Sequence, residues 1–240
     1  MNIPFTAATG EAGAPKSALK TWVSYPERKD NAPVVIVIHE IFGLTDWVRG
    51  VADQLAAEGF IAVAPDLLSG KGPDGGATDS FEGDKVRAAI GALDKDEMVI
   101  RLDAARAYAT ALPAATKKCA VIGFCWGGTT VWTYATKQPA LDAGIVYYGT
   151  APDDKDALAK ITAPILGCYG EDDQRVTSTV EKTETLTKEA GRSFDAKIYD
   201  GAGHGFLRQQ TGRDGANEKA ARASWAETLA FLRAKLEGKG

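Results

Sequence analysis

The sequence predicts an α/β fold in which a doubly wound, mostly parallel sheet carries helices on both faces. Strand-like runs alternate with helical segments along the 240 residues, and this alternation is typical of parallel βαβ units. Several strand-like runs are unbroken apolar stretches, of which residues 34–38 (VVIVI) are the clearest. Strands that are buried on both faces have this pattern. No stretch has the composition of a linker, so we predict a single domain over residues 1–240.

The predicted elements follow one another in a regular order. Strands are predicted over residues 20–25, 34–38, 60–64, 118–123, 143–148, 165–169 and 194–199. Helices are predicted over residues 46–58, 84–93, 94–112, 126–136, 178–190 and 217–236. Gly59 stands where a helix C-cap is expected, and Pro113 ends the longer of the two middle helices. Residues 67–83 contain five glycines and are predicted to form a loop, which at this length is typically functional.

Composition excludes several classes of protein. The chain is 45% hydrophobic and 25% charged, with a formal net charge of −4 and no basic patch, so we expect no nucleic-acid partner. No apolar run approaches the ~20 residues of a membrane span, and residues 1–13 lack the pattern of a signal peptide. We therefore expect a cytoplasmic protein, although the small residues at its start also fit a chain that follows a removed leader. With three cysteines and two histidines in no ligand-like spacing, we expect neither a disulfide framework nor a metal or other cofactor.

The clearest chemical signal is the segment GFCWGG at residues 123–128. It lies between a predicted strand and a predicted helix, as a nucleophile elbow does, with cysteine in place of the usual serine. The tight turn crowds the backbone, which explains the glycines, and the start of the helix favours a thiolate at Cys125. The alternative is a buried structural cysteine beside closely packed glycines.

A nucleophilic cysteine needs a base and an acid. In this fold the acid and then the histidine follow the nucleophile along the chain. His204 is the one histidine after Cys125, and it lies in a glycine-rich loop after the last predicted strand. The acid is expected after the strand at 165–169, where the pattern GxxDxxV selects Asp173 and leaves Asp172 as the alternative. Its role is to hold the imidazole in one tautomer. The backbone N–H groups of Trp126 and Ile41 are the expected oxyanion hole, since one donor follows the nucleophile and the other follows an early strand.

Together these segments resemble the dienelactone hydrolase family of α/β-hydrolases. The similarity runs from about Val34 to Phe231, and the matching segments are HEIFG (39–43), APDL (64–67), GFCWGG (123–128), YYG (147–149), GxxDxxV (170–176) and GxxHxF (201–206). The resemblance implies one α/β-hydrolase domain that opens the enol-lactone ring of dienelactones. It also implies the triad Cys125, Asp173 and His204.

The resemblance implies further site residues. Glu40 would help to convert the thiol to a thiolate when substrate arrives, whereas its simpler interpretation is a surface carboxylate at a strand end. Arg208, four residues after His204, would bind the substrate carboxylate with its guanidinium fork. Tyr148 of the YYG segment is assigned to substrate binding. The second arginine that the family places before residue 90 has no clear match in this chain.

The expected reaction is cleavage of a lactone or ester through a thioester on Cys125. The substrate partner is a small molecule, with no membrane partner, and the chain is expected to be a monomer or a weak dimer. A broad esterase that acts on other activated esters, including phosphorus esters, is the alternative within enzymes. Two further hypotheses are a non-catalytic binding protein and a redox thiol at Cys125. Cys119 and Cys168 read as buried strand residues rather than as its resolving partners.

Overall fold

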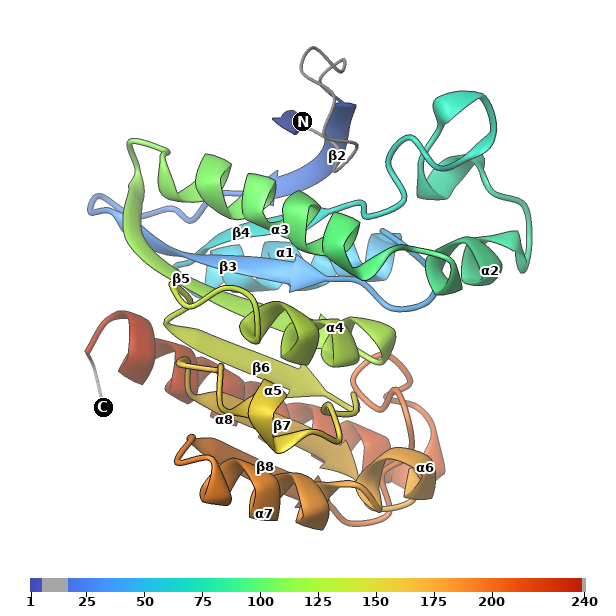
Figure 1. The fold of residues 1–240 in the computed structure, drawn as a ribbon, viewed down its shortest axis with the longest axis vertical. Coiled ribbons are helices and arrows are strands. Elements are labelled where there is room, and N and C mark those ends of the chain that lie inside the picture. Colours follow the sequence, from blue (N-terminus) through green and yellow to red (C-terminus); the bar gives the residue numbers. More distant parts are fainter. Residues whose placement is uncertain (6–16, 239–240) are drawn as a thin grey trace. The chain divides into compact units, whose positions relative to one another are not determined.

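The computed structural model describes residues 1–5 and 17–238 (Figure 1). The chain divides between Cys119 and Ala120, inside one strand, into two compact units that are described here in turn. Residues 1–13 were tested for the pattern of a signal peptide, and residues 6–13 of this stretch lie outside the described residues. No helix in the described ranges is long and apolar enough to cross a membrane. That the chain is a single domain stays a prediction.

The first unit contains a mixed sheet with the strand order β1-β2-β4-β3. Its elements are β1 (Asn2–Phe5), β2 (Ser17–Ser24), β3 (Ala32–Ile38), α1 (Asp46–Ala57), β4 (Ile61–Pro65), α2 (Lys85–Gly91), α3 (Lys95–Thr110) and the start of β5 (Ala115–Phe124). The pairs β1–β2 and β2–β4 are antiparallel, and β3–β4 is parallel. Strand β3 is buried along its whole length, as its unbroken apolar run predicts. Strand β1 was not predicted, because four residues are too few to show a pattern.

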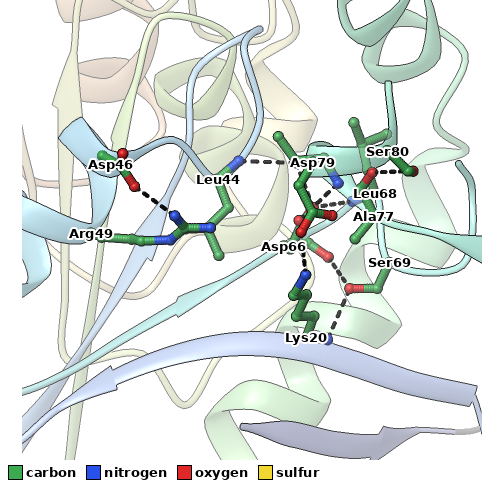
Figure 2. Close-up of polar contacts among 11 residues, drawn as sticks. Lys20, Leu44, Asp46, Arg49, Asp66, Leu68, Ser69, Ala77, Asp79 and Ser80 are labelled. Atoms are coloured by element: carbon green, nitrogen blue, oxygen red, sulfur yellow. Dashed lines mark hydrogen bonds and ion pairs between the residues drawn. The ribbon is translucent and has the colours of Figure 1, made fainter. Parts of the chain in front are cut away.

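The glycine-rich loop that follows β4 is anchored by a buried carboxylate. Asp66 accepts hydrogen bonds from the N–H of Leu68 (3.0 Å), from the N–H of Thr78 (3.0 Å) and from the Thr78 hydroxyl (2.8 Å). That hydroxyl in turn accepts from the N–H of Leu44, at 3.1 Å. Figure 2 shows Asp66 among these contacts, with Lys20 paired to Asp79 beside it. Asp66, at the end of a β-strand, therefore ties two loops of the first unit together.

The second unit has an all-parallel strand order, β5-β6-β7-β8. Its elements are the end of β5, α4 (Trp126–Ala135), β6 (Ala143–Tyr147), α5 (Lys155–Leu158), β7 (Ile165–Gly170), α6 (Gln174–Thr177), α7 (Val180–Glu189), β8 (Phe194–Tyr199) and α8 (Ala216–Leu236). Helices α4 and α8 lie on opposite faces of these strands (Figure 1). The two units together have the mostly parallel strands and covering helices that the sequence predicts.

The single-turn helices α5 and α6 were not predicted. Each has four residues and begins after an aspartate, Asp154 or Asp173, and the Asp154 carboxylate accepts from the N–H of Asp156. Such short segments carry no apolar periodicity, so they leave no helical signal in the sequence. Helix α7 is correspondingly shorter than the predicted range 178–190.

Candidate active site

Cys125 lies in a strained turn between a strand and a helix. Strand β5 ends at Phe124 and α4 begins at Trp126, while Cys125 between them has φ +56° and ψ −116°. Its N–H donates to the carbonyl of Tyr147 on the next strand, at 3.0 Å. A non-glycine residue in this sparsely populated region of φ and ψ costs about 1–3 kcal/mol, and such residues cluster at functional sites. The elbow predicted from GFCWGG is thus the local geometry of Cys125.

The glycines beside Cys125 are required by close backbone approach. A Cβ on Gly123 would lie 2.2 Å from the carbonyl oxygen of Gly127. A Cβ on Gly128 would lie 2.6 Å from the carbonyl oxygen of Tyr147. Real Cβ atoms do not approach backbone atoms this closely, so a side chain at either position would force the turn apart. The glycine pattern therefore has a steric cause at these two positions.

His204 lies in the loop between β8 and α8 and joins the cysteine to an aspartate. Its Nε2 is 3.0 Å from the Sγ of Cys125, and its Nδ1 is 2.5 Å from the Oδ2 of Asp173. An ionised carboxylate only accepts hydrogen bonds, so Nδ1 carries the hydrogen of that contact, and Nε2 is the ring nitrogen that faces the sulfur. The three predicted residues are brought together in one hydrogen-bonded chain.

The two neighbouring aspartates have different surroundings. Asp173 is buried at the start of α6 and contacts the imidazole. Asp172 is exposed and forms an ion pair with Arg213 at 2.5 Å. The geometry therefore assigns the histidine contact to Asp173 and leaves Asp172 on the surface.

Tyr148 forms a wall behind the imidazole. Its ring centroid is 5.1 Å from that of His204, edge to face, and it also packs against Tyr147 and Phe206. The residue is 1% exposed and has φ +41°. This burial favours a role in holding the histidine ring, while the substrate contact assigned to Tyr148 stays a prediction.

The histidine loop is held by a residue that sequence reasoning missed. Asn217, in the first turn of α8, accepts from the N–H of Gly203 at 2.9 Å and donates to the carbonyl of Gln209 at 2.7 Å. Its side chain is buried, so one amide fixes the loop on both sides of His204. Nothing in the sequence distinguishes this asparagine from a helix-capping one, and only the fold shows its two partners.

The pKa of His204 is raised to about 9 from its ordinary value of 6.5. Partial burial lowers this pKa, but the hydrogen bonds to Asp173 and Cys125 and the charges of those two groups outweigh burial. The imidazole is therefore held as imidazolium over a wider pH range than a free histidine.

We expect this raised pKa to make the stability of the chain depend on pH. Because the folded protein binds the proton of His204 more tightly than the unfolded chain does, the resulting stabilisation is complete below about pH 6.5 and is lost as the pH rises through about 9. Denaturant titrations at several pH values should show this decline in the free energy of unfolding. The variant His204→Gln should lack it, and parallel curves for the two proteins would contradict the assignment.

Arg208 lies on the surface of the same loop. Its side chain is exposed, and a guanidinium nitrogen is 3.8 Å from where a Cβ of Gly205 would be. Arg208, the cation predicted to bind the substrate carboxylate, is thus four residues from His204 in the same loop.

Trp126 is the first residue of α4, where the backbone N–H groups of a helix point outward from its N-terminus. The binding roles predicted for Trp126 and Arg208 stay predictions.

Glu40 and Ile41 belong to the first unit, in the turn after β3. Glu40 is 3% exposed, so it is not the surface carboxylate of the simpler interpretation. Its backbone carbonyl accepts from the N–H of Gly43 at 3.1 Å.

His39 fixes this turn through both of its ring nitrogens. Its Nε2 accepts from the N–H of Leu67 (3.2 Å), and its Nδ1 donates to the carbonyl of Glu40 (2.8 Å). Burial lowers the pKa of His39, against the opposing charge of Asp66. His39 therefore holds this turn as a neutral residue, and the roles of Glu40 and Ile41 stay predictions.

The described part of the chain contains no cluster of three or more histidine, cysteine, aspartate or glutamate side chains that could hold a metal ion. Cys119 and Cys168 are buried in strands, as predicted. Burial raises the pKa of the Cys168 thiol to about 12. Cys168 is therefore a neutral packing residue, unlike the partly exposed Cys125.

A strained cysteine between a strand and a helix, with an aspartate and a histidine after later parallel strands, is the arrangement of an enzyme with the α/β-hydrolase fold. The model of the dienelactone hydrolase family matches residues 19–236. The chain therefore belongs to the dienelactone hydrolase family, whose members are hydrolases of lactones and esters.

Individual relatives agree with this membership. A Methylorubrum extorquens protein provisionally named carboxymethylenebutenolidase is 33% identical over 185 residues, which are 72% of this chain but only 63% of that protein. A probable 2-oxo-3-(5-oxofuran-2-ylidene)propanoate lactonase of a Bradyrhizobium species is 31% identical and covers 91% of this chain and 90% of its own. The crystal structure of a dienelactone hydrolase-like promiscuous phosphotriesterase from metagenomic libraries has a TM-score of 0.80 at 23% identity, covering 98% of this chain and 97% of that one. This last likeness shows the shared fold.

Proposed function

We propose that this protein hydrolyses a small lactone or ester that carries a carboxylate, with Cys125 as the nucleophile. The observation that carries the proposal is the continuous chain from Sγ of Cys125 through the His204 imidazole to Oδ2 of Asp173. A nucleophile in contact with a base, and a base in contact with a buried orienting acid, is the arrangement that covalent catalysis requires. The matching family model and the related lactonase support the substrate class.

The proposed reaction has two halves. In the first, the Cys125 sulfur transfers its proton to Nε2 of His204 and attacks the carbonyl carbon, and the ring oxygen leaves with the electrons of the broken C–O bond. An enolate is a good leaving group, and it takes from His204 the proton that came from Cys125, so that Nε2 can then act as a base. The product at this stage is a thioester on Cys125.

In the second half, water attacks the carbonyl carbon that the enolate left. His204 removes a proton from the water, the hydroxyl oxygen attacks the thioester carbonyl, and the sulfur leaves as thiolate and takes that proton back from Nε2. The product is an open-chain acid, and the cysteine returns to its starting state. Every proton moves through Nε2 of His204, and these steps need no cofactor.

The negative charge on the carbonyl oxygen requires hydrogen-bond donors in each half. The N–H of Trp126 is the donor that we propose in the second unit, since it follows the nucleophile at the N-terminus of α4. The partial positive charge of a helix N-terminus also favours the thiolate. The backbone N–H of Ile41 remains the predicted second donor. Glu40 remains predicted to help convert the Cys125 thiol to a thiolate.

Arg208 is the proposed anchor for a substrate carboxylate. We expect Arg208→Ala to raise KM about tenfold for a lactone that bears a carboxylate, because a charge-assisted hydrogen bond contributes about 1.5–3 kcal/mol in favourable cases. The rate on a neutral p-nitrophenyl ester should not change. The matched control is Arg222→Ala, which removes an exposed arginine from α8 that pairs with Glu218.

A panel of lactones, carboxylic esters and phosphotriesters decides between this proposal and its alternative, a broad esterase that includes phosphorus esters. A preference for carboxylate-bearing lactones that Arg208→Ala removes would support the proposal. Equal rates on neutral esters, or an equal KM increase in the Arg222→Ala control, would contradict the proposed anchor.

A further inference from the structure

Strand β8 forms the outer edge of the parallel sheet in the second unit. Within the described residues it pairs with β7 and with no further strand. Alternate residues of a strand direct their N–H and C=O groups to opposite sides, so an edge strand presents a row of unpaired backbone groups. This row is available to another strand of suitable shape and charge.

The hydrogen bonds to β7 show which residues of β8 point outward. The carbonyl of Ser193 accepts from the N–H of Ile165, and the carbonyl of Tyr199 accepts from the N–H of Glu171, both at 3.0 Å. Residues 193, 195, 197 and 199 therefore direct their backbone groups inward to β7. The backbone groups of the residues between them, Phe194, Ala196 and Ile198, point away from the sheet.

We infer that two copies of this chain associate through β8, as antiparallel strands across a two-fold axis at Ala196. In this register each Ala196 lies opposite the other, and Phe194 lies opposite the partner's Ile198. These are the residues whose backbone groups point outward, so each opposite pair exchanges two N–H···O bonds, as an antiparallel ladder requires. The outward groups of both edges are then satisfied together.

The charges of β8 favour this register. Asp195 and Lys197 form an ion pair at 3.1 Å along the strand and remain partly exposed. With the axis at Ala196, Asp195 lies opposite the partner's Lys197 and Lys197 opposite the partner's Asp195. These are the non-hydrogen-bonded positions, where opposite Cα atoms are only about 4.5 Å apart. The four charges then alternate in sign in both directions, which stabilises the pair.

Other registers lose this complementarity. A two-fold axis at Lys197 places two lysines opposite each other, and an axis at Asp195 places two aspartates opposite each other. Both registers are disfavoured because like charges at opposite positions are destabilising. Charged side chains on an edge strand also discourage pairing with unrelated strands. The same two residues therefore reject most strands and accept a second copy of β8.

The apolar residues of β8 give the association a modest driving force. Ile198 is 49% exposed, and the pairing would cover it with Phe194 of the partner. A contact limited to one six-residue strand is small compared with the interfaces of stable dimers. We therefore expect a dimer that forms reversibly and weakly.

Sedimentation velocity on the full chain tests the inference. Lys197→Asp places aspartates opposite aspartates, and Asp195→Lys places lysines opposite lysines, so each variant alone should be monomeric. An equimolar mixture of the two variants restores every opposite-charge pair and should form a heterodimer. Ala196→Pro removes an outward N–H without removing a bond to β7, as proline is tolerated on an edge, and should also be monomeric.

The matched control is Lys95→Asp, the same change of charge at the start of α3 in the first unit, which should dimerise like the unchanged protein. A protein that stays monomeric up to about 1 mM, well above the range of weak association, would overturn the inference. So would a dimer that both charge variants retain, or a mixture of the two variants that remains monomeric. Circular dichroism on each variant confirms that the fold is intact.

Discussion

We expect the replacement of Cys125 with alanine to lower the hydrolysis rate about 10⁴-fold or more, the range seen when a nucleophile is removed from a triad. Alanine leaves His204 and Asp173 in contact with each other but removes the sulfur atom on which we propose that the thioester forms. The sulfur of Cys125 is the group in contact with Nε2, whereas Cys119 and Cys168 are buried in strands. Initial rates on the preferred lactone measure the effect.

A covalent readout separates a lost nucleophile from a damaged fold. Intact-mass measurements after rapid mixing with a slow substrate should show one acyl group on the unchanged protein and none on Cys125→Ala. Alkylation by iodoacetamide should mark Cys125, while Cys168, whose pKa is raised to about 12 by burial, stays unmodified. Cys168→Ala is the matched control and should retain acylation. Full activity in Cys125→Ala would contradict the proposed mechanism.

Asp173→Asn is expected to lower kcat by about 10³–10⁴-fold while the fold is retained. The amide can donate where the carboxylate only accepts, so it favours the tautomer that carries hydrogen on Nε2. That hydrogen would then face the sulfur and block proton transfer. The substitution also removes the negative charge of Asp173, which stabilises the imidazolium.

Asp172→Asn is the matched control, one residue away. It weakens an exposed ion pair with Arg213, and such pairs contribute about 0–1 kcal/mol. We expect its activity to stay within about twofold of the unchanged protein, since it does not touch the histidine. Equal losses in the two variants, or a larger loss in Asp172→Asn, would show that Asp173 does not orient His204. Thermal melting of both variants reports any loss of folding.

Local patterns predicted most of the fold and part of the site. The buried strands were predicted because a run such as residues 34–38 is apolar on both faces. The elbow at Cys125 was predicted because its glycines, strand and helix are adjacent in the chain. The short elements β1, α5 and α6 were missed, because four residues show neither a period of 2 nor one of 3.6.

Tertiary contacts decided what local patterns left open. Asp172 and Asp173 are equivalent in composition, and only the turn into α6 buries one of them against His204. Asn217 binds both sides of the histidine loop from a helix 13 positions after His204 in the sequence. Tyr148, which its motif assigns to substrate binding, packs against the imidazole of His204, and its substrate contact stays a prediction. Each of these facts depends on segments that meet only after folding.

The left-handed backbone at Cys125 has an evolutionary consequence. Cysteine at φ +56° destabilises the turn, and glycine would adopt the same conformation without that cost. Selection for thermal stability alone would therefore favour glycine at position 125 and would remove the thiol. The proposed catalytic role of Cys125 and the heat resistance of the chain are therefore opposed at this residue, and laboratory evolution toward a higher melting temperature should include a screen for activity to retain the cysteine.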